Sequence, residues 1–481
     1  MVFSGIEFLL GFLPVFLVIY YLTPVKYKNI IIFIGSLFFY AYGEPKYIFL
    51  LLLSMIVNYA FGRMIEPKYR ASKKRKPKRQ EIEKFRKSEY KRKLCFIAIV
   101  VLNVAVLVLF KWTPDGLGLP LGVSFYTFQV ISYLVDVYRG EIKAERSFLK
   151  LGTYICMFPQ LVAGPIVNYS EVSETLKKPV VSGKQFDCGL KTFVWGLVLK
   201  VLIADRLSLL WREIATIGYV SISTPVAWMG AFSYSMQIYF DFYGYSLMAI
   251  GLGRMLGYSL PINFDLPYMA KSIREFYRKW HMTLGRWFTK YVYIPMGGSR
   301  KGVVRTMCNL LVVWVLTSFW HGGSLNFLLW GMLLCLFIMA EKMIGMLLKK
   351  QNKSAESNGR EVPKSVAVLR NVLGHCYVLL VIPVTWMCFA IGKTTDLYHY
   401  LGRMFGFVEG LNVNPLMFAE KWSKYGILLL IAAFLCTPVA EKFFNKWRDR
   451  LPGMVVLTGL FWLCVWYLVT MGDNPFMYFR F

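Results

Sequence analysis

The sequence predicts an all-α polytopic integral membrane protein, a class indicated by its composition, its recurring apolar runs and the placement of its charge. The chain has 481 residues, of which 57% are hydrophobic, 17% aromatic and only 17% charged. These fractions lie far from those of a soluble domain. Several apolar runs approach the roughly 20 residues that a helix needs to cross a hydrocarbon layer of about 30 Å. The runs cover residues 3–22, 94–110, 324–340, 371–391, 425–436 and 454–470.

The positive charge of the chain is concentrated in three loops. The formal net charge is +29, and residues 62–93, 265–305 and 349–370 together supply 22 of these charges. Loops rich in Lys and Arg beside apolar segments are typical of cytoplasmic connections. We therefore interpret the charge as a topology signal that also attracts the anionic headgroups of the lipid bilayer, and we expect no nucleic-acid partner.

Cytoplasmic placement of these loops predicts roughly 11–13 transmembrane helices in a single membrane domain over residues 1–481. The first run has no basic n-region and no small-residue cleavage site, so we expect a retained span.

The apolar segment 151–169 contains Pro159, Gly164 and Pro165. Broken backbone at membrane depth must be buried in protein or line a cavity, so this segment is predicted to be kinked or re-entrant. The nine cysteines show no metal-ligand spacing, and we expect neither a disulfide framework nor a metal site.

A basic and aromatic segment carries the first histidine of interest. Residues 274–299 read REFYRKWHMTLGRWFTKYVYIPMGGS and place His281 among alternating aromatic and cationic side chains. Such a segment suits the membrane interface. The alternative to a functional role is an interfacial helix whose histidine faces lipid headgroups.

The second histidine lies in the stretch TSFWHGGSLNFLLWG, residues 317–331. The 15 residues 306–320 before it would form a helix of about 22 Å, shorter than the hydrocarbon layer. His321 is therefore expected to lie at a turn within the membrane, where an ionisable side chain usually faces a cavity. Gly322 and Gly323 would allow close approach of backbone or ligand. The alternative is a histidine that only hydrogen-bonds neighbouring helices.

A histidine in an apolar cavity suits proton transfer without a metal ion. Its unperturbed pKa near ~6.5 lets the neutral imidazole take a proton from a hydroxyl that attacks a carbonyl. Exclusion of bulk water would limit hydrolysis of an activated acyl donor. Asp241 also lies within an apolar run, MQIYFDFYGYS, where it would orient a histidine, bind substrate or pair with a basic residue.

Several different motifs follow one another along most of the chain. They read YGEPKYIFLLLLS at 42–54, LGVSFYTFQVISYLVDVYRG at 121–140, MFPQLVAGPI at 157–166, MQIYFDFYGYSLMAIGLGRMLG from 236, the histidine segments from 274 and 317, and NPFMYFRF at 474–481. Together they resemble the membrane-bound O-acyltransferase (MBOAT) superfamily. The resemblance is to the bacterial branch with the membrane subunit of alginate O-acetylation and, more distantly, to the teichoic acid D-alanyltransferase.

The resemblance implies a helical bundle around a central tunnel, with the histidine-bearing core at about 236–348. It implies that His321 is the catalytic histidine, acting as general base, and that His281 is its catalytic companion on the cytoplasmic side. The substrate-tunnel candidates are Trp320 and Asn326 beside His321, Trp280 and Arg278 nearer the donor thioester, and Asp241. The chain departs from the usual pattern at Tyr243, Leu247, Tyr277 and Phe319, and the first two bear on the identity of the acceptor.

The function implied is transfer of an acyl group, foremost acetyl, from a cytoplasmic thioester to a hydroxyl of an extracytoplasmic polysaccharide or to a secreted acetyltransferase partner. No permanently bound cofactor is implied, and acetyl-CoA or another acyl thioester would be the donor substrate. A cytoplasmic acyl-carrier protein could dock on the basic loop 62–93. The expected location is the cell (inner or plasma) membrane. The alternatives are D-alanyl transfer from a carrier protein to teichoic acid, a transporter or flippase of a lipid-linked glycan, and a scaffold without chemistry.

Overall fold

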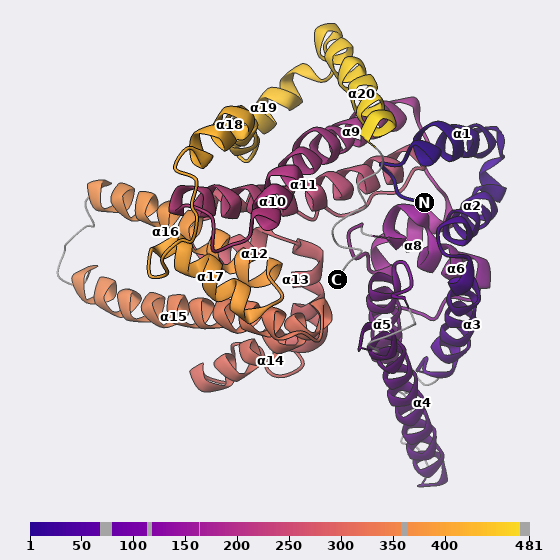
Figure 1. Ribbon diagram of the computed structural model, residues 1–481. Coiled ribbons are helices and arrows are strands. Elements are labelled where there is room, and N and C mark those ends of the chain that lie inside the picture. Colours follow the sequence, from indigo (N-terminus) through magenta and orange to yellow (C-terminus); the bar gives the residue numbers. More distant parts are fainter. Residues whose placement is uncertain (68–78, 113–117, 163, 357–363, 472–481) are drawn as a thin grey trace. The chain divides into compact units, whose positions relative to one another are not determined.

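The computed structural model describes residues 1–67, 79–112, 118–162, 164–356 and 364–471 (Figure 1). These parts of the chain contain helices and no strand, which confirms the predicted all-α class. They belong to two compact units, Met1–Phe193 with Met248–Pro261, and Val194–Leu247 with Ile262–Phe481. Part of the basic loop, residues 68–78, and the motif at 474–481 lie outside the described residues.

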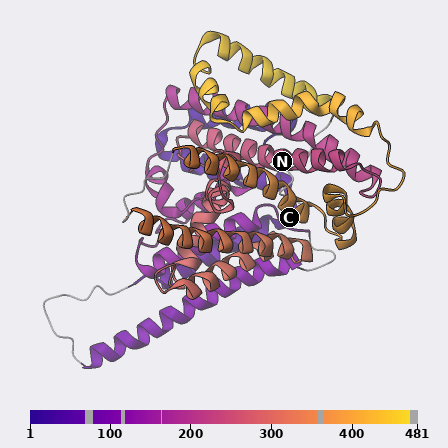
Figure 2. The same cartoon turned by 90° about the vertical axis from the view of Figure 1, so that its left-hand side faces the viewer.

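The first unit contains the N-terminal helices. They are η1 (Glu7–Phe12), α1 (Leu13–Leu22), η2 (Val25–Tyr27), α2 (Lys28–Gly43), η3 (Pro45–Tyr47), α3 (Ile48–Met64), α4 (Arg79–Trp112), α5 (Val123–Arg139), α6 (Phe148–Cys156), α7 (Phe158–Leu161), α8 (Tyr169–Lys177) and most of α9 (Gly183–Val198). Figure 2 shows α4 as the long purple helix. Its 34 residues span about 51 Å, more than a hydrocarbon layer requires.

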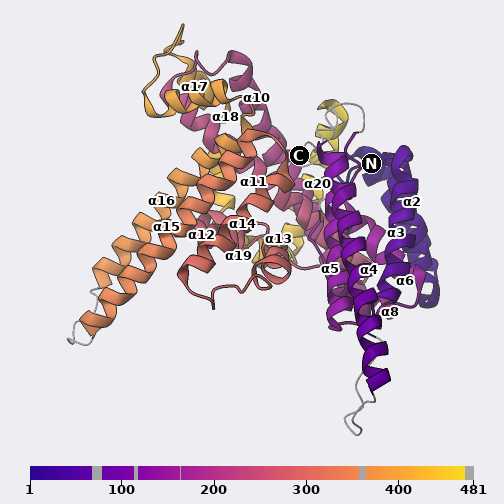
Figure 3. The ribbon, with the colours of Figure 1, turned by 90° about the horizontal axis from the view of Figure 1, so that it is seen from below.

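The second unit contains the remaining helices and both histidine motifs. Its elements are η4 (Leu199–Ala204), α10 (Asp205–Ile217), most of α11 (Thr224–Met255), η5 (Pro267–Met269), α12 (Ile273–Lys279), α13 (Met282–Phe288), η6 (Thr289–Tyr293), α14 (Val303–His321), α15 (Leu325–Glu356), α16 (Lys364–Ala390), α17 (Thr394–Phe405), α18 (Met417–Leu435), α19 (Pro438–Trp447) and α20 (Leu451–Met471). Helices α15 and α16 lie side by side (Figure 3).

Six helices in the described parts of the chain are long and apolar enough to cross a membrane, or seven if the bent pair α18 and α19 is one span. This number includes only long apolar helices of the described residues and leaves out shorter apolar helices such as Glu7–Leu22, so it is not a count of the 11–13 spans predicted from the sequence. Within the run at 3–22, η1 and α1 follow each other without a gap and form the apolar helix Glu7–Leu22, and α9, η4 and α10 likewise follow one another without a gap. The polytopic membrane architecture itself is confirmed.

The segment 151–169 is broken, as its prolines and glycine predict. Helix α6 ends at Cys156 and the four-residue helix α7 begins at Phe158. Side chains satisfy the irregular backbone: the Phe158 amide donates to Ser36 Oγ at 3.1 Å, and the Tyr154 hydroxyl donates to the Val167 carbonyl at 2.7 Å. The break is therefore buried in protein within the first unit, which is what membrane depth requires.

Helices α14 and α15 form an antiparallel pair whose turn carries His321. Close approach of the two helices depends on Gly331, because a Cβ atom there would lie 1.9 Å from Ser318 Oγ. Helix α12 is joined to the same pair, since the Glu341 carboxylate on α15 accepts hydrogen bonds from the amides of Ile273 and Arg274 at 2.6 and 3.0 Å. These contacts place the segment before His281 against the helices that present His321.

Candidate active site

His321 is the last residue of α14 and is only 5% exposed. Its imidazole is surrounded by aromatic rings: the centroid lies 4.7 Å from Trp320, 5.0 Å from Trp330 and 5.1 Å from Phe389. Trp330 and Phe389 belong to α15 and α16. The turn expected from the shortness of residues 306–320 is therefore present, and it buries an ionisable side chain among aromatic rings.

Asn326 shapes the turn that follows His321. Its amide donates to the Phe389 carbonyl at 3.0 Å, and its carbonyl oxygen accepts a hydrogen bond from Ser324 Oγ at 2.6 Å. The side chain thus ties the beginning of α15 to the end of α16. It holds the aromatic surroundings of His321 in position.

His281 lies at the junction of α12 and α13 and is buried. Its backbone has φ 45° and ψ 53°, a left-handed conformation that is unfavourable for a residue with a side chain. Strain of this kind persists only where the surroundings hold it, and it is concentrated at functional sites. Burial lowers the pKa of His281 to about 3, so the imidazole is neutral at physiological pH.

Trp320 brings the two histidines into one site. Its ring centroid lies 4.7 Å from His321 and 6.2 Å from His281. A second aromatic connection begins at Trp280, whose ring centroid lies 5.0 Å from that of Trp386. The ring of Trp386 stacks on that of Trp330, beside His321, with 6.0 Å between the two centroids. Four of the residues selected from the sequence, two histidines and two tryptophans, therefore occupy one buried cluster.

Asp241 has a different setting from the histidines. It is buried on α11, where its carboxylate lies 2.8 Å from Lys200 Nζ, and the same ammonium group donates to Asp205 at 2.6 Å. Of the three roles considered for Asp241, the structure contains the pairing with a basic residue. Lys200 and Asp205 were not selected from the sequence, although a lysine and an aspartate within an apolar run are a recognisable signal of a buried ion pair.

Arg278 is exposed on α12, in contrast to its buried neighbours Trp280 and His281. Asn263, which was not predicted as a site residue, is buried and contacts His281 Nδ1 at 3.0 Å through its side-chain oxygen. No local pattern marks this asparagine, because it lies 18 positions before the histidine, with η5 and α12 between them.

The family model for membrane-bound O-acyltransferases matches residues 141–384, a range that includes all seven candidate residues. The chain is also 32% identical over 410 residues to a probable alginate O-acetylase of Pseudomonas fluorescens, covering 84% of this chain and 75% of that protein. The chain belongs to the membrane-bound O-acyltransferase family. It is thus an acyltransferase, and the multi-pass helical architecture fits the membrane-bound character of the family.

Two further relatives modify cell-wall polymers. The chain is 34% identical over 377 residues to a peptidoglycan O-acetyltransferase of Helicobacter pylori, covering 68% of this chain and 67% of that protein. It is 26% identical over 230 residues to a teichoic acid D-alanyltransferase of Bacillus subtilis, covering 46% and 58%. For this membrane-bound O-acyltransferase, the greater similarity therefore lies with relatives named as acetyl-transferring proteins.

Proposed function

We propose that this chain is an O-acetyltransferase that moves an acetyl group from a cytoplasmic thioester, acetyl-CoA, to a hydroxyl of an extracytoplasmic polysaccharide. The observation that carries the proposal is the convergence of His281 and His321 on Trp320 in a buried aromatic cluster. Histidine is suited to this chemistry because its neutral form accepts a proton at physiological pH.

In the proposed reaction, His321 removes the proton of the acceptor hydroxyl as the oxygen attacks the thioester carbonyl carbon. An ester C–O bond forms and the C–S bond breaks. The imidazolium of His321 then returns the proton to the leaving sulfur, which departs as a thiol. The apolar rings of Trp330 and Phe389 beside His321 would exclude water, which would otherwise compete with the acceptor for the acyl group.

The remaining residues of the site would position substrates. Trp320 and Asn326 would shape the pocket around His321, while Trp280 and the exposed Arg278 would lie nearer the incoming thioester. Asp241 would act through its contact with Lys200, as part of the helix framework. The polymer hydroxyl would receive the acetyl group directly or by way of a secreted acetyltransferase, and the chain would reside in the bacterial inner or plasma membrane.

Radiolabelled acetyl-CoA offered to membranes that contain this chain tests the proposal. Label should appear in cell-surface polymer with the wild-type chain and disappear with His321→Ala. The matched control is His399→Ala, which removes a histidine of α17 outside the cluster and should leave the labelling unchanged. Equal labelling by wild type and His321→Ala, at equal amounts of folded protein, would contradict the catalytic role.

A second candidate function is D-alanyl transfer from a carrier protein to teichoic acid. The similarity to the teichoic acid D-alanyltransferase favours it, although that similarity covers less than half of the chain. An acidic carrier would find cationic residues in the segment 62–93, of which residues 79–93 belong to α4. Replacing acetyl-CoA by a D-alanyl carrier thioester in the same membranes separates the two candidates, because only the accepted donor transfers label through His321.

A further inference from the structure

Asn263 is a buried residue outside every helix, and its side chain contacts the turn that carries His281. Its side-chain oxygen Oδ1 lies 3.0 Å from His281 Nδ1, 2.9 Å from Thr283 Oγ1 and 3.3 Å from the backbone nitrogen of Thr283. Its side-chain nitrogen donates to Ser246 Oγ on α11 at 3.3 Å. One side chain thus joins α11 to the beginning of α13.

The backbone of Asn263 supports the same turn. Its carbonyl oxygen accepts a hydrogen bond from the Met282 amide at 2.9 Å, and two residues later the Asp265 amide donates to the Lys279 carbonyl at 3.1 Å. These bonds enclose His281 on both sides. They account for the persistence of the left-handed backbone at His281, which requires support from its surroundings.

The contacts of Asn263 determine which nitrogen of His281 carries the proton. A backbone N–H can only donate, so the atom that faces Thr283 N is the oxygen of the amide and not its nitrogen. That oxygen accepts, and His281 Nδ1 must therefore donate to it. In the neutral imidazole the proton then resides on Nδ1 and the lone pair on Nε2.

We propose that Asn263 is a positioning residue that holds His281 in the Nδ1-protonated tautomer, so that His281 Nε2 accepts a hydrogen bond from an N–H or O–H group of a bound substrate. This inference rests on the proposed acyl transfer and divides the work between the two histidines. His281 binds and orients through an acceptor nitrogen, and it gives no proton to the leaving sulfur. Proton transfer belongs to His321 alone.

The first test is a direct measurement of the tautomer. The chain has four histidines, so protein labelled with ring ¹⁵N-histidine gives few signals, and loss of one set in His281→Gln assigns the residue. The wild-type spectrum should show a protonated Nδ1 and an unprotonated Nε2 for His281. A protonated Nε2 would overturn the proposal without reference to any activity.

The second test links the tautomer to catalysis. Asn263→Ala should abolish the preference for the Nδ1 proton and lower the turnover number for acetyl transfer by roughly tenfold to a hundredfold, the loss that follows removal of the hydrogen-bond partner of a metal-ligating histidine. Asn263→Asp keeps an acceptor oxygen and should restore the Nδ1 proton and part of the rate. Asn58→Ala, which removes a buried amide of α3 in the first unit, should change neither.

The outcomes separate this inference from the proposed function. If His321→Ala abolishes transfer while folded Asn263→Ala retains the wild-type tautomer and rate, Asn263 has no positioning role and the proposed function stands. If His321→Ala transfers acetyl groups as well as the wild type, the proposed function fails, and the tautomer measurement still decides what Asn263 does. If Asn263→Ala does not fold, the wild-type spectrum and Asn263→Asp carry the test.

Discussion

Replacement of Lys200 by methionine should destabilise the second unit strongly, because it removes the cation that two buried carboxylates contact. Lys200 is 1% exposed, with its Nζ 2.6 Å from Asp205 and 2.8 Å from Asp241. Breaking a buried ion pair on one side costs about 3–5 kcal/mol, because the remaining charge stays desolvated. For a unit of this size we expect the midpoint of thermal unfolding to fall by on the order of 10 °C.

The assay is thermal unfolding in detergent micelles followed by circular dichroism, with three variants compared. Lys200→Met alone should be the least stable. Lys200→Met combined with Asp205→Asn and Asp241→Asn should recover much of the loss, because none of these three charges remains. Lys191→Met is the matched control: its partner Asp187 is 54% exposed, and pairs of that kind contribute about 0–1 kcal/mol. A Lys200→Met midpoint equal to that of the control or of the triple variant would show that Lys200 does not stabilise the two carboxylates.

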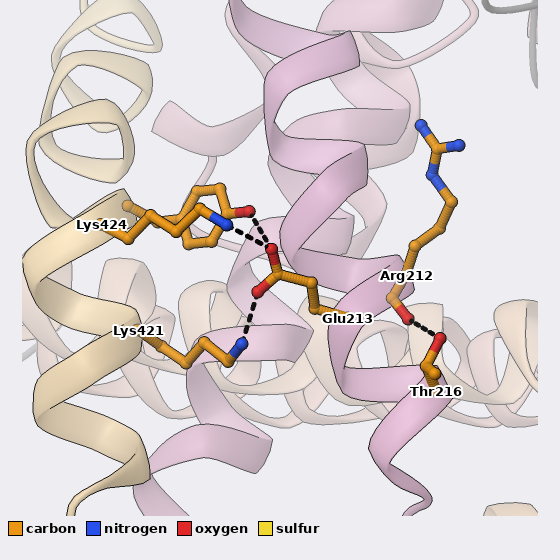
Figure 4. Close-up of polar contacts among 6 residues, drawn as sticks. Arg212, Glu213, Thr216, Lys421 and Lys424 are labelled. Atoms are coloured by element: carbon orange, nitrogen blue, oxygen red, sulfur yellow. Dashed lines mark hydrogen bonds and ion pairs between the residues drawn. The ribbon is translucent and has the colours of Figure 1, made fainter.

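Three further outcomes follow from the packing and the electrostatics. Gly331→Ala should lower the unfolding midpoint and the transfer rate, because its Cβ would lie 1.9 Å from Ser318 Oγ. Adding Ser318→Ala to this variant should restore part of both. Gly345→Ala is the control and should change neither, because open space surrounds that glycine. Burial alone would raise the pKa of Glu213, but hydrogen bonds from Lys421, Lys424 and Tyr425 and the charge of Lys421 lower it to about 2 (Figure 4). Because the pKa of Glu213 is lower in the folded state, the carboxylate adds to the free energy of unfolding above its unfolded pKa of about 4.5, and this addition is lost as the pH falls toward 2. In Glu213→Gln, the free energy of unfolding should therefore depend less on pH between about 4.5 and 2. Burial lowers the pKa of His281 to about 3 in the folded state, so between pH 6.5 and pH 3 the imidazole binds a proton in the unfolded state but not in the folded state. The unfolding midpoint should therefore decline as the pH falls from 6.5 toward 3. The decline should be less steep in His281→Gln.

The sequence was sufficient for the fold class and for the turn at His321. The helices follow from the apolar runs, and the break in the segment 151–169 follows from its proline and glycine residues. Both patterns depend only on residues that are close in the sequence. The helix before His321 ends at that residue, as the length of residues 306–320 predicts. Hydropathy does not report how long each continuous helix is, so the six long apolar helices of the described residues do not by themselves give the number of spans.

The contacts within the site depended on information that one sequence does not contain. Asn263 meets His281 only because main-chain bonds bring their two irregular segments together. A partner for Asp241 was expected, since buried charges pair, but the sequence did not determine that Lys200 would face Asp241 and Asp205 at once. The exposure of Arg278 depends on which side of the short helix α12 packs inward, and seven residues carry too little periodicity to decide it.

Transmembrane acyl transfer through His321 can be measured with the purified chain in proteoliposomes, with labelled acetyl-CoA on one side of the bilayer and an oligosaccharide acceptor on the other. We predict that wild-type protein acetylates the acceptor across the membrane and that His321→Ala, folded and inserted to the same extent, gives only the background rate of empty liposomes. Transfer by His321→Ala at the wild-type rate would contradict the catalytic role of His321.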